Sequence, residues 1–265
     1  MAIFIFEPSV SFNYDFALRH WKFLYQSIQD LVKQGLKVNL FYGEAIDVFR
    51  DLFETYGSLN VFSHQETGNY LTFSRDKNLK LYFQENEINW FEYQQNMVVR
   101  GLKNRKNWDI KWIKEAKKEV LKKPNLSLQK TILSNKYPVP QDLITKLEES
   151  EKGVHLGGEL QAKMVLDDFL QKKIEKYWES ISYPEKSRYY SSMISAYITY
   201  GNISIKQIYQ RCEEFQSIVK NKKSLNQFKA RLKWHCHFIQ KLEMEPSIEF
   251  ENLNPLFNQI RKNKN

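Results

Sequence analysis

Val61-Phe-Ser-His-Gln-Glu-Thr-Gly-Asn-Tyr-Leu-Thr-Phe-Ser-Arg-Asp76 carries the strongest fold signal in the sequence. A short apolar run predicts a strand over 59–63, and a helical pattern follows over 75–86. Polar residues fill the connection between them, at the carboxyl end of a strand, where open parallel sheets place their ligands. The segment therefore predicts one strand–helix unit of a layered sheet, with a candidate site after the strand.

Further strands and helices alternate on both sides of this unit. β-branched and aromatic runs predict strands at Ile3–Glu7, Lys37–Tyr42 and Ile88–Tyr93. Helical spacing of apolar residues predicts helices at Leu18–Gln34 and Gly43–Tyr56. We therefore predict an α/β Rossmann-like parallel sheet. Because the first strand begins at residue 2 and such sheets usually have five or more strands, we expect this one to lack a piece.

The chain is long enough for two domains, and its composition suggests where they divide. At 265 residues, 42% of them apolar, it exceeds one typical domain and has material for a core. A Pro- and Gly-containing stretch predicts a linker over 113–156, with a short helix at Gln141–Glu149. Helical patterns dominate from 157 to 265. The predicted order is thus a sheet domain over 1–112, a linker and an incomplete all-α domain.

Charge and cysteine usage narrow the classes of protein. The net charge of +9 has two explanations that charge does not separate: a polyanionic partner, or a Lys-rich coding bias. Trp108 and Trp112, four residues apart in a Lys-rich segment, predict a helix with one aromatic face; its basic face is solvated or contacts nucleic acid. Two cysteines and the lack of a leader or a long apolar run favour a cytoplasmic protein without disulfides or membrane spans.

Two segments in the first part resemble a known family. The 61–76 segment is similar to the Ser-His-Glu-Glu-Thr-Gly…Arg-Asp motif of the DNA photolyase/cryptochrome flavoproteins. Gln95-Asn-Met-Val-Val-Arg-Gly-Leu-Lys-Asn-Arg105 resembles the Gln-x-Gly-Val-Val-Arg-x-Leu-Lys-x-Arg run that follows it in that family's antenna domain. The resemblance implies an antenna chromophore of folate or deazaflavin type near Glu66 and Arg75.

The helical part carries the same resemblance. Tyr177 and Ser191-Ser-Met-Ile-Ser-Ala-Tyr197 resemble the family segment whose hydroxyls hold the FAD phosphates. The resemblance implies FAD binding by Tyr177, Ser191, Ser192 and Ser195. Taken alone, the serines would be read as helix caps. Met193 stands where the family commonly has Arg, and Ala196 where it has Pro, so one phosphate partner is lost.

A late segment resembles the family helix that lies between flavin and lesion. In Arg231-Leu-Lys-Trp-His-Cys-His-Phe-Ile-Gln-Lys-Leu-Glu243, Trp234 matches a residue that stacks on a flipped pyrimidine. Arg231 and His235 replace the family's Glu and Arg as candidate substrate-binding residues. His235 and His237 lie two apart on a predicted helix, about 200° from each other, so we expect no metal site.

The resemblance implies light-driven electron transfer from FAD to pyrimidine dimers in DNA, a carbon–carbon lyase reaction. It identifies no catalytic residue. A cryptochrome-like photoreceptor and a non-catalytic remnant are the alternatives. The family plan also contains a first strand with an Arg-Asp-Leu-Arg motif and further helices beyond 249–261, which this sequence does not carry. We therefore expect a truncated chain that is inactive by itself.

Overall fold

The computed structural model divides the chain into two compact units. It describes residues 1–265 except 12, 14–15, 127–128, 131–134, 152 and 260–265. Unit 1 comprises Met1–Ser58 and Ala116–Ala230, and unit 2 comprises Leu59–Glu115 and Arg231–Asn265. Parts of the predicted linker and the last residues of the predicted helical domain lie outside the described residues. The predicted domain bounds 1–112, 113–156 and 157–265 stay a prediction.

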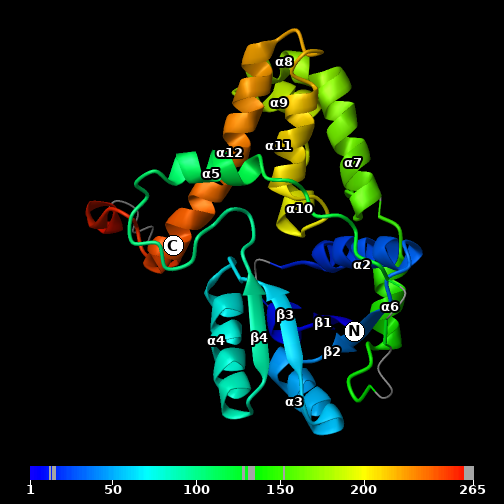
Figure 1. Cartoon of the computed structure of the whole chain (residues 1–265). Coiled ribbons are helices and arrows are strands. Elements are labelled where there is room, and N and C mark those ends of the chain that lie inside the picture. The colour runs from blue at the N-terminus through cyan, green and yellow to red at the C-terminus, as the bar shows by residue number, and fades with distance from the viewer. Residues whose placement is uncertain (12, 14–15, 127–128, 131–134, 152, 260–265) are drawn as a thin grey trace. The chain divides into compact units, whose positions relative to one another are not determined.

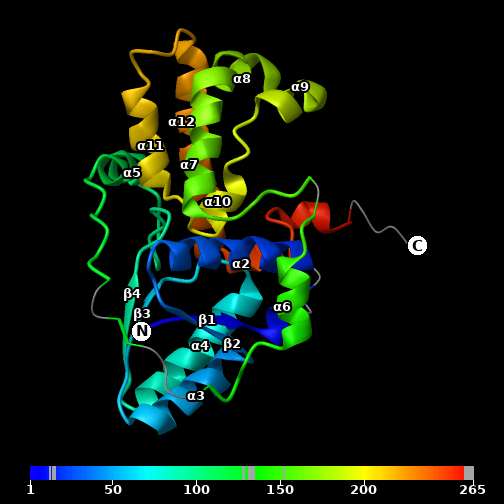
Figure 2. The same ribbon diagram turned by 90° about the vertical axis from the view of Figure 1, so that its right-hand side faces the viewer.

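Unit 1 begins with two parallel strands packed against helices. Strand β1 (Ala2–Phe6) pairs with β2 (Val38–Tyr42), with Phe6 opposite Tyr42. Phe4 and Phe6 of β1 pack with Trp21 of helix α2 (Leu18–Lys33) and Leu147 of helix α6 (Gln141–Glu148). Figure 2 shows both helices beside the β1–β2 pair. Phe41 alternates to the other face of the sheet and is fully buried there as well. The helices of this part are α1 (Pro8–Ser11), α2 (Leu18–Lys33), α3 (Ala45–Tyr56) and α6 (Gln141–Glu148).

The outer edge of β2 is closed by a later segment of the chain. The Tyr42 N–H donates to the Tyr137 carbonyl oxygen at 2.9 Å, and the Asn135 side-chain amide donates to the Leu40 carbonyl at 2.9 Å. On the inner side, the Gly43 N–H donates to the Phe6 carbonyl at 3.1 Å. Asn135 and Tyr137 thus make hydrogen bonds that a third strand would otherwise make with β2.

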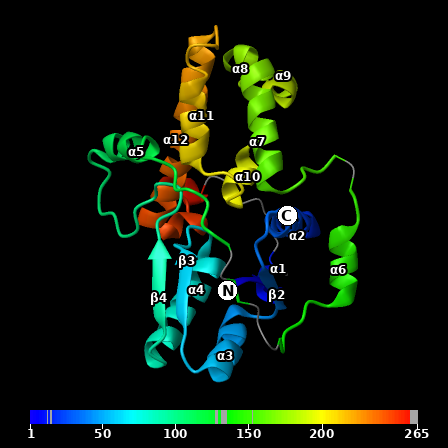
Figure 3. The same ribbon diagram turned by 45° about the vertical axis from the view of Figure 1, so that its right-hand side comes forward.

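Helices make up the rest of unit 1 (Figure 3). Tyr177 packs edge-on against Phe169 and Phe228 in their core. A π-helical turn at Phe169–Lys173 separates two of the helices. The helices are α7 (Glu159–Asp168), α8 (Ile174–Ser180), α9 (Pro184–Tyr190), α10 (Ser195–Thr199), α11 (Ile205–Glu214) and the first turns of α12 (Lys222–Met244).

A pair of glycines brings α7 against α2. A Cβ atom on Gly157 would lie 2.0 Å from the Phe23 carbonyl oxygen, and Gly158 has a φ of +122°. Both positions therefore require glycine. The Asp30 carboxylate accepts the Glu159 N–H at 2.8 Å, which satisfies a free donor at the start of α7. The Gly-Gly-Glu motif at 157–159 thus has a packing role.

Unit 2 holds the second strand pair and most of α12 (Figure 1). Strand β3 (Asn60–His64) pairs in parallel with β4 (Asn89–Tyr93). Trp108 and Trp112 are both buried, which confirms the predicted aromatic face of their helix. The four strands form two separate parallel pairs, so the parallel direction predicted from the sequence is confirmed. The remaining elements are α4 (Tyr70–Glu85), α5 (Trp108–Ala116) and 3₁₀ turns at Pro246–Glu249 and Pro255–Gln259.

Candidate functional site

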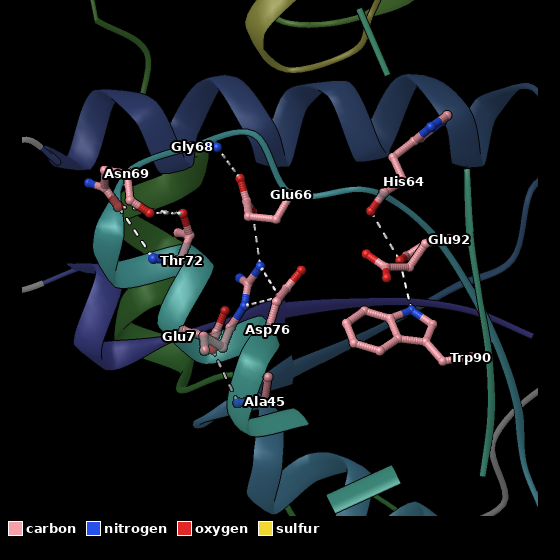
Figure 4. A network of polar contacts seen from close by, with 12 residues as sticks. Glu7, Ala45, His64, Glu66, Gly68, Asn69, Thr72, Asp76, Trp90 and Glu92 are labelled. Atoms are coloured by element: carbon pink, nitrogen blue, oxygen red, sulfur yellow. Dashed lines mark hydrogen bonds and ion pairs between the residues drawn. The ribbon is translucent and has the colours of Figure 1, made fainter. Parts of the chain in front are cut away.

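Five charged side chains gather where β3 and β4 end in unit 2. We call them the ion cluster: Glu66, Arg75, Asp76, Glu92 and Arg100. Figure 4 shows Glu66, Asp76 and Glu92 near His64, the last residue of β3. The carboxyl ends of parallel strands are where such folds place ligands, as the sequence predicted.

Arg75 joins two carboxylates of the ion cluster. Its guanidinium lies 3.0 Å from a Glu66 carboxylate oxygen, and its Nε donates to Asp76 at 2.9 Å. Burial raises the pKa of Asp76, with smaller contributions from the negative charges of Glu66 and Glu92, while Arg75 opposes the shift. The contact with Arg75 therefore holds the Asp76 carboxylate in place, although burial disfavours its charged form.

Arg100 connects the strand ends to helix α12. Its guanidinium lies 2.8 Å from Glu92, donates to the Glu66 carbonyl oxygen at 2.5 Å, and lies 3.7 Å from Glu243 of α12. Arginine suits this position because its planar fork serves several acceptors at once. Arg100 is thus the centre of the polar contacts in unit 2.

The predicted antenna residues, Glu66 and Arg75, are brought together by the structure and pair with each other. The Glu66 carboxylate also accepts the Gly68 N–H at 2.5 Å (Figure 4), which shapes the connection to α4. The Asn69 side chain then accepts the Thr72 N–H and caps α4. These contacts give both residues a role in fixing the connection, and their contact with a chromophore stays a prediction.

Asp76 should make the stability of the protein depend on pH. The pKa of an aspartate is near 3.8 in the unfolded chain and is raised in the folded one, so the folded state binds the proton more tightly. The contribution of Asp76 to the free energy of unfolding is therefore expected to fall as pH rises from 3.8 through the raised pKa. Urea denaturation at several pH values across this range gives the free energy of unfolding. The slope of this free energy against pH should differ between the wild type and Asp76→Asn. Parallel pH profiles for the two proteins would contradict the assignment.

The predicted flavin-binding serines lie together on the connection between α9 and α10 in unit 1. Ser191 and Ser192 are half-buried and Ser195 is exposed. Ser191 donates to the Met193 sulfur at 3.0 Å, and Met193 has a φ of +53°. Ile194, and not a serine, occupies the N-cap of α10, so none of these serines caps the start of that helix. Ser191 is the C-cap residue of α9.

This turn has the donors that a phosphate group requires. Within the part of the chain that the structure describes, the Ser192 and Ser195 hydroxyls have no hydrogen-bond partner, which leaves them available to an anion. Tyr177 differs, because its ring is 6% exposed in the aromatic core. Any contact of Tyr177 with a ligand would therefore come through its hydroxyl.

The predicted substrate residues lie on the unit 2 part of α12. Trp234 is 49% exposed, and the Arg231 guanidinium stands 4.5 Å from its ring centre. The stacked cation keeps the indole in one orientation on the helix surface. His235 is half-buried, and burial lowers its pKa, which favours the neutral imidazole.

Cys236 and His237 follow His235 on α12. Burial raises the pKa of Cys236 to about 12, so it stays a thiol. His237 lies 2.8 Å from the Arg105 guanidinium on the surface. Within the described residues, no three His, Cys, Asp or Glu side chains converge on a common point. None of the helices that the structure describes is both long and apolar enough to cross a bilayer.

Gln240 was not anticipated from the sequence. Its side chain is fully buried, donates to the Val99 carbonyl oxygen at 2.9 Å and accepts the Val99 N–H at 2.8 Å. A polar residue on the buried side of an otherwise apolar helical pattern was the available signal. It joins α12 to the backbone next to Arg100.

The fold is that of the photolyases and cryptochromes. No protein-family model matches the chain, and no curated protein matches it by sequence. Solved structures do match it nearly from end to end. A bacterial class III photolyase from Agrobacterium tumefaciens superposes with a TM-score of 0.75 over 98% of this chain at 19% identity. A cryptochrome from Synechocystis sp. PCC6803 gives 0.71 over 97% at 17% identity.

An archaeal photolyase from Sulfolobus tokodaii, solved with two FAD molecules, has the same fold. It superposes with a TM-score of 0.66 over the full chain at 16% identity. The match covers 57%, 59% and 58% of the Agrobacterium, Synechocystis and Sulfolobus chains. The present chain thus spans less than three fifths of the length of these proteins.

Proposed function

We propose that this chain is part of a photolyase-like flavoprotein that binds FAD and acts on pyrimidine dimers in DNA in the cytoplasm. The observation that carries the proposal is the match to photolyases over nearly the whole chain, together with a serine turn in which the Ser192 and Ser195 hydroxyls have no hydrogen-bond partner among the described residues. The Rossmann-like character of the first part and the FAD-binding character of the helical part belong to this proposal.

FAD would supply the light-driven electron transfer, and this chain would supply position and charge. Ser191, Ser192 and Ser195 would donate to the diphosphate, with Tyr177 beside them. Met193 leaves this turn without a cation, because a thioether carries no charge and only weakly accepts hydrogen bonds. We therefore propose a weaker hold on the diphosphate than an arginine at this position would give.

DNA would meet the exposed aromatic surface of α12. The Trp234 indole offers a flat face for stacking an unpaired base, and Arg231 above it adds a positive charge. His235, kept neutral by burial, serves as a hydrogen-bonding group without charge. The net charge of +9 favours a polyanion.

Two alternatives are distinguished by activity. A cryptochrome-like photoreceptor would bind FAD without repairing DNA, and the substitution of two family residues by Arg231 and His235 favours this reading of the substrate surface. A non-catalytic remnant would not bind FAD and would keep only protein or DNA contacts. An antenna pigment of folate or deazaflavin type near Glu66 and Arg75 completes the proposal for the longer protein.

Alanine at the three serines tests the flavin site. The protein carrying Ser191→Ala, Ser192→Ala and Ser195→Ala should bind FAD at least about tenfold more weakly than the wild type, because several hydrogen bonds to charged oxygens are lost. FAD titration followed by quenching of flavin fluorescence measures the difference. Ser187→Ala is the matched control, since the Ser187 hydroxyl is used within α9, where it donates to Pro184. Equal affinity in the triple variant and the control would overturn the assignment.

Activity then separates the three functions. If the wild type binds FAD, loss of cyclobutane dimers from irradiated DNA under blue light supports a photolyase. FAD binding without dimer loss supports the photoreceptor. Absence of FAD binding supports the remnant. In the photolyase case, Trp234→Ala should weaken binding to dimer-containing DNA, because base stacking contributes about 1–3 kcal/mol.

A further inference from the structure

Lys176 of α8 is a cation without a counter-charge among the described residues. Its ammonium lies 5.3 Å from the ring centre of Tyr190 and donates to the Tyr190 hydroxyl at 3.4 Å. In the part of the chain that the structure describes, it forms no ion pair with a carboxylate. An aromatic ring attracts a cation without neutralising it. Lys176 therefore keeps its charge available for an anion.

Tyr190 brings this charge to the beginning of the serine turn, residues 191–195. Tyr190 is the last residue of α9, and Ser191 follows it as the C-cap. Helices α8 and α9 lie side by side at one end of the helical part of unit 1 (Figure 2). The Lys176 ammonium thus stands beside the start of a turn that has hydroxyls open to an anion.

Three neighbouring lysines are engaged elsewhere. Lys172 and Lys173 both pair with Asp168, at 2.9 Å and 2.5 Å. Lys186 lies 4.9 Å from the ring centre of Tyr183. Tyr183 is the N-cap of α9, about 10 Å along the helix from the end that precedes the serine turn. Lys176 is therefore better placed than these three lysines to serve the turn.

We propose that Lys176 supplies the positive charge of the diphosphate site, where Met193 brings none. This inference rests on the proposed function, in which the serine turn holds the FAD diphosphate. Both phosphates of a dinucleotide are anionic, and neutral hydroxyls leave their charge uncompensated. Lysine suits the position because its compact ammonium, on a flexible stem, moves readily from Tyr190 to a phosphate oxygen. Lys176 is then a binding residue for the diphosphate, and Tyr190 positions it.

Substitution of Lys176 tests the proposal on the full chain with three ligands. Lys176→Met should bind FAD at least about tenfold more weakly than the wild type, because a charge-assisted hydrogen bond is lost. Riboflavin has the same ring system without phosphates, and its affinity should not change. Inorganic pyrophosphate has the phosphates without the ring, and its affinity should fall as that of FAD does. Quenching of flavin fluorescence measures the first two affinities, and titration calorimetry measures the third.

A charge restored within the turn separates binding from a structural role. Met193→Arg, added to Lys176→Met, should raise FAD affinity at least about tenfold, because the guanidinium replaces the lost charge. In the wild type the same change should raise affinity by less, since Lys176 already supplies a charge there. A structural role of Lys176 would not be rescued by a cation at residue 193.

Two cations of α9 provide matched controls. Lys186→Met removes a lysine from the same kind of pair with a tyrosine. Arg188→Met removes an exposed cation that lies two residues before Tyr190, about 200° around the helix. Neither change should alter FAD affinity by more than about twofold. Lys176→Arg keeps the charge and should retain FAD binding.

The outcomes separate this inference from the proposed function. Pyrophosphate binding that depends on Lys176, without FAD binding, would support the Lys176 site and contradict the flavoprotein. Equal FAD affinity in the wild type and Lys176→Met would overturn the Lys176 site and leave the flavoprotein standing. An equal loss of riboflavin affinity in the variant would also overturn the site. A wild type that binds neither FAD nor pyrophosphate would overturn both.

Discussion

Replacing Arg100 with methionine is expected to lower the free energy of unfolding by about 2–4 kcal/mol. The change leaves the Glu92 and Glu243 carboxylates without their cation and removes the donor to the Glu66 carbonyl. The expected loss is below that of a fully buried pair, because Arg100 keeps 28% of its side chain exposed. Urea denaturation followed by circular dichroism measures it.

Two comparisons make the Arg100 prediction specific. Adding Glu92→Gln to Arg100→Met should recover part of the lost stability, since the unpaired charge is then removed. Arg105→Met deletes an exposed arginine of the same segment and should change stability by no more than about 0.5 kcal/mol. A similar loss in both arginine variants would show that the ion cluster is not the cause.

Replacing Gln240 with leucine is expected to cost about 2–3 kcal/mol. Leucine matches the apolar surroundings of α12 but leaves both main-chain groups of Val99 without their partner. Leucine should increase the buried apolar surface, so packing alone predicts a more stable protein. Loss of the two hydrogen bonds predicts a less stable one, and the sign of the change in stability therefore distinguishes the two effects. Denaturation of the variant, monitored by tryptophan fluorescence, gives the free energy.

Gln84 offers the matched control for Gln240. It is an exposed glutamine on α4 in the same unit, and Gln84→Leu should change stability by no more than about 0.5 kcal/mol. A stabilised Gln240→Leu protein would contradict the assigned role. Water would then form hydrogen bonds with the Val99 N–H and carbonyl in place of Gln240.

Most helix and strand ends could be predicted from the sequence to within a residue or two, and the start of α4 is an exception. The first predicted strand, Ile3–Glu7, is observed at Ala2–Phe6, because a β-branched and aromatic run ends at a proline. The helix predicted to begin at Arg75 begins instead at Tyr70, since the Asn69 side chain caps it. The Asn69–Thr72 spacing held that information, but the polar residues around it are typical of a loop.

The tertiary arrangement was harder to predict from the sequence than the local structure. Parallel strands were predicted correctly, but the separation into two pairs depends on which edges find partners, and that information is not local. The ion cluster shows the same limit. Glu66 and Arg75 were predicted through a resemblance to lie near one chromophore, whereas the contact between Arg100 and Glu243 joins residues 143 positions apart. The serine turn was predicted as a group, and its segment is contiguous in the chain.

The π-helical turn at Phe169–Lys173 has a consequence for comparing this chain with its structural neighbours. A turn of this type takes up one residue more than an α-helical turn, so the helix after Lys173 is rotated by about 100° relative to an uninterrupted α-helix. An alignment against such a helix must open a one-residue gap here. Without that gap, each residue of Ile174–Ser180 is paired with a position on a different side of the helix, and the true correspondence at Tyr177 is lost.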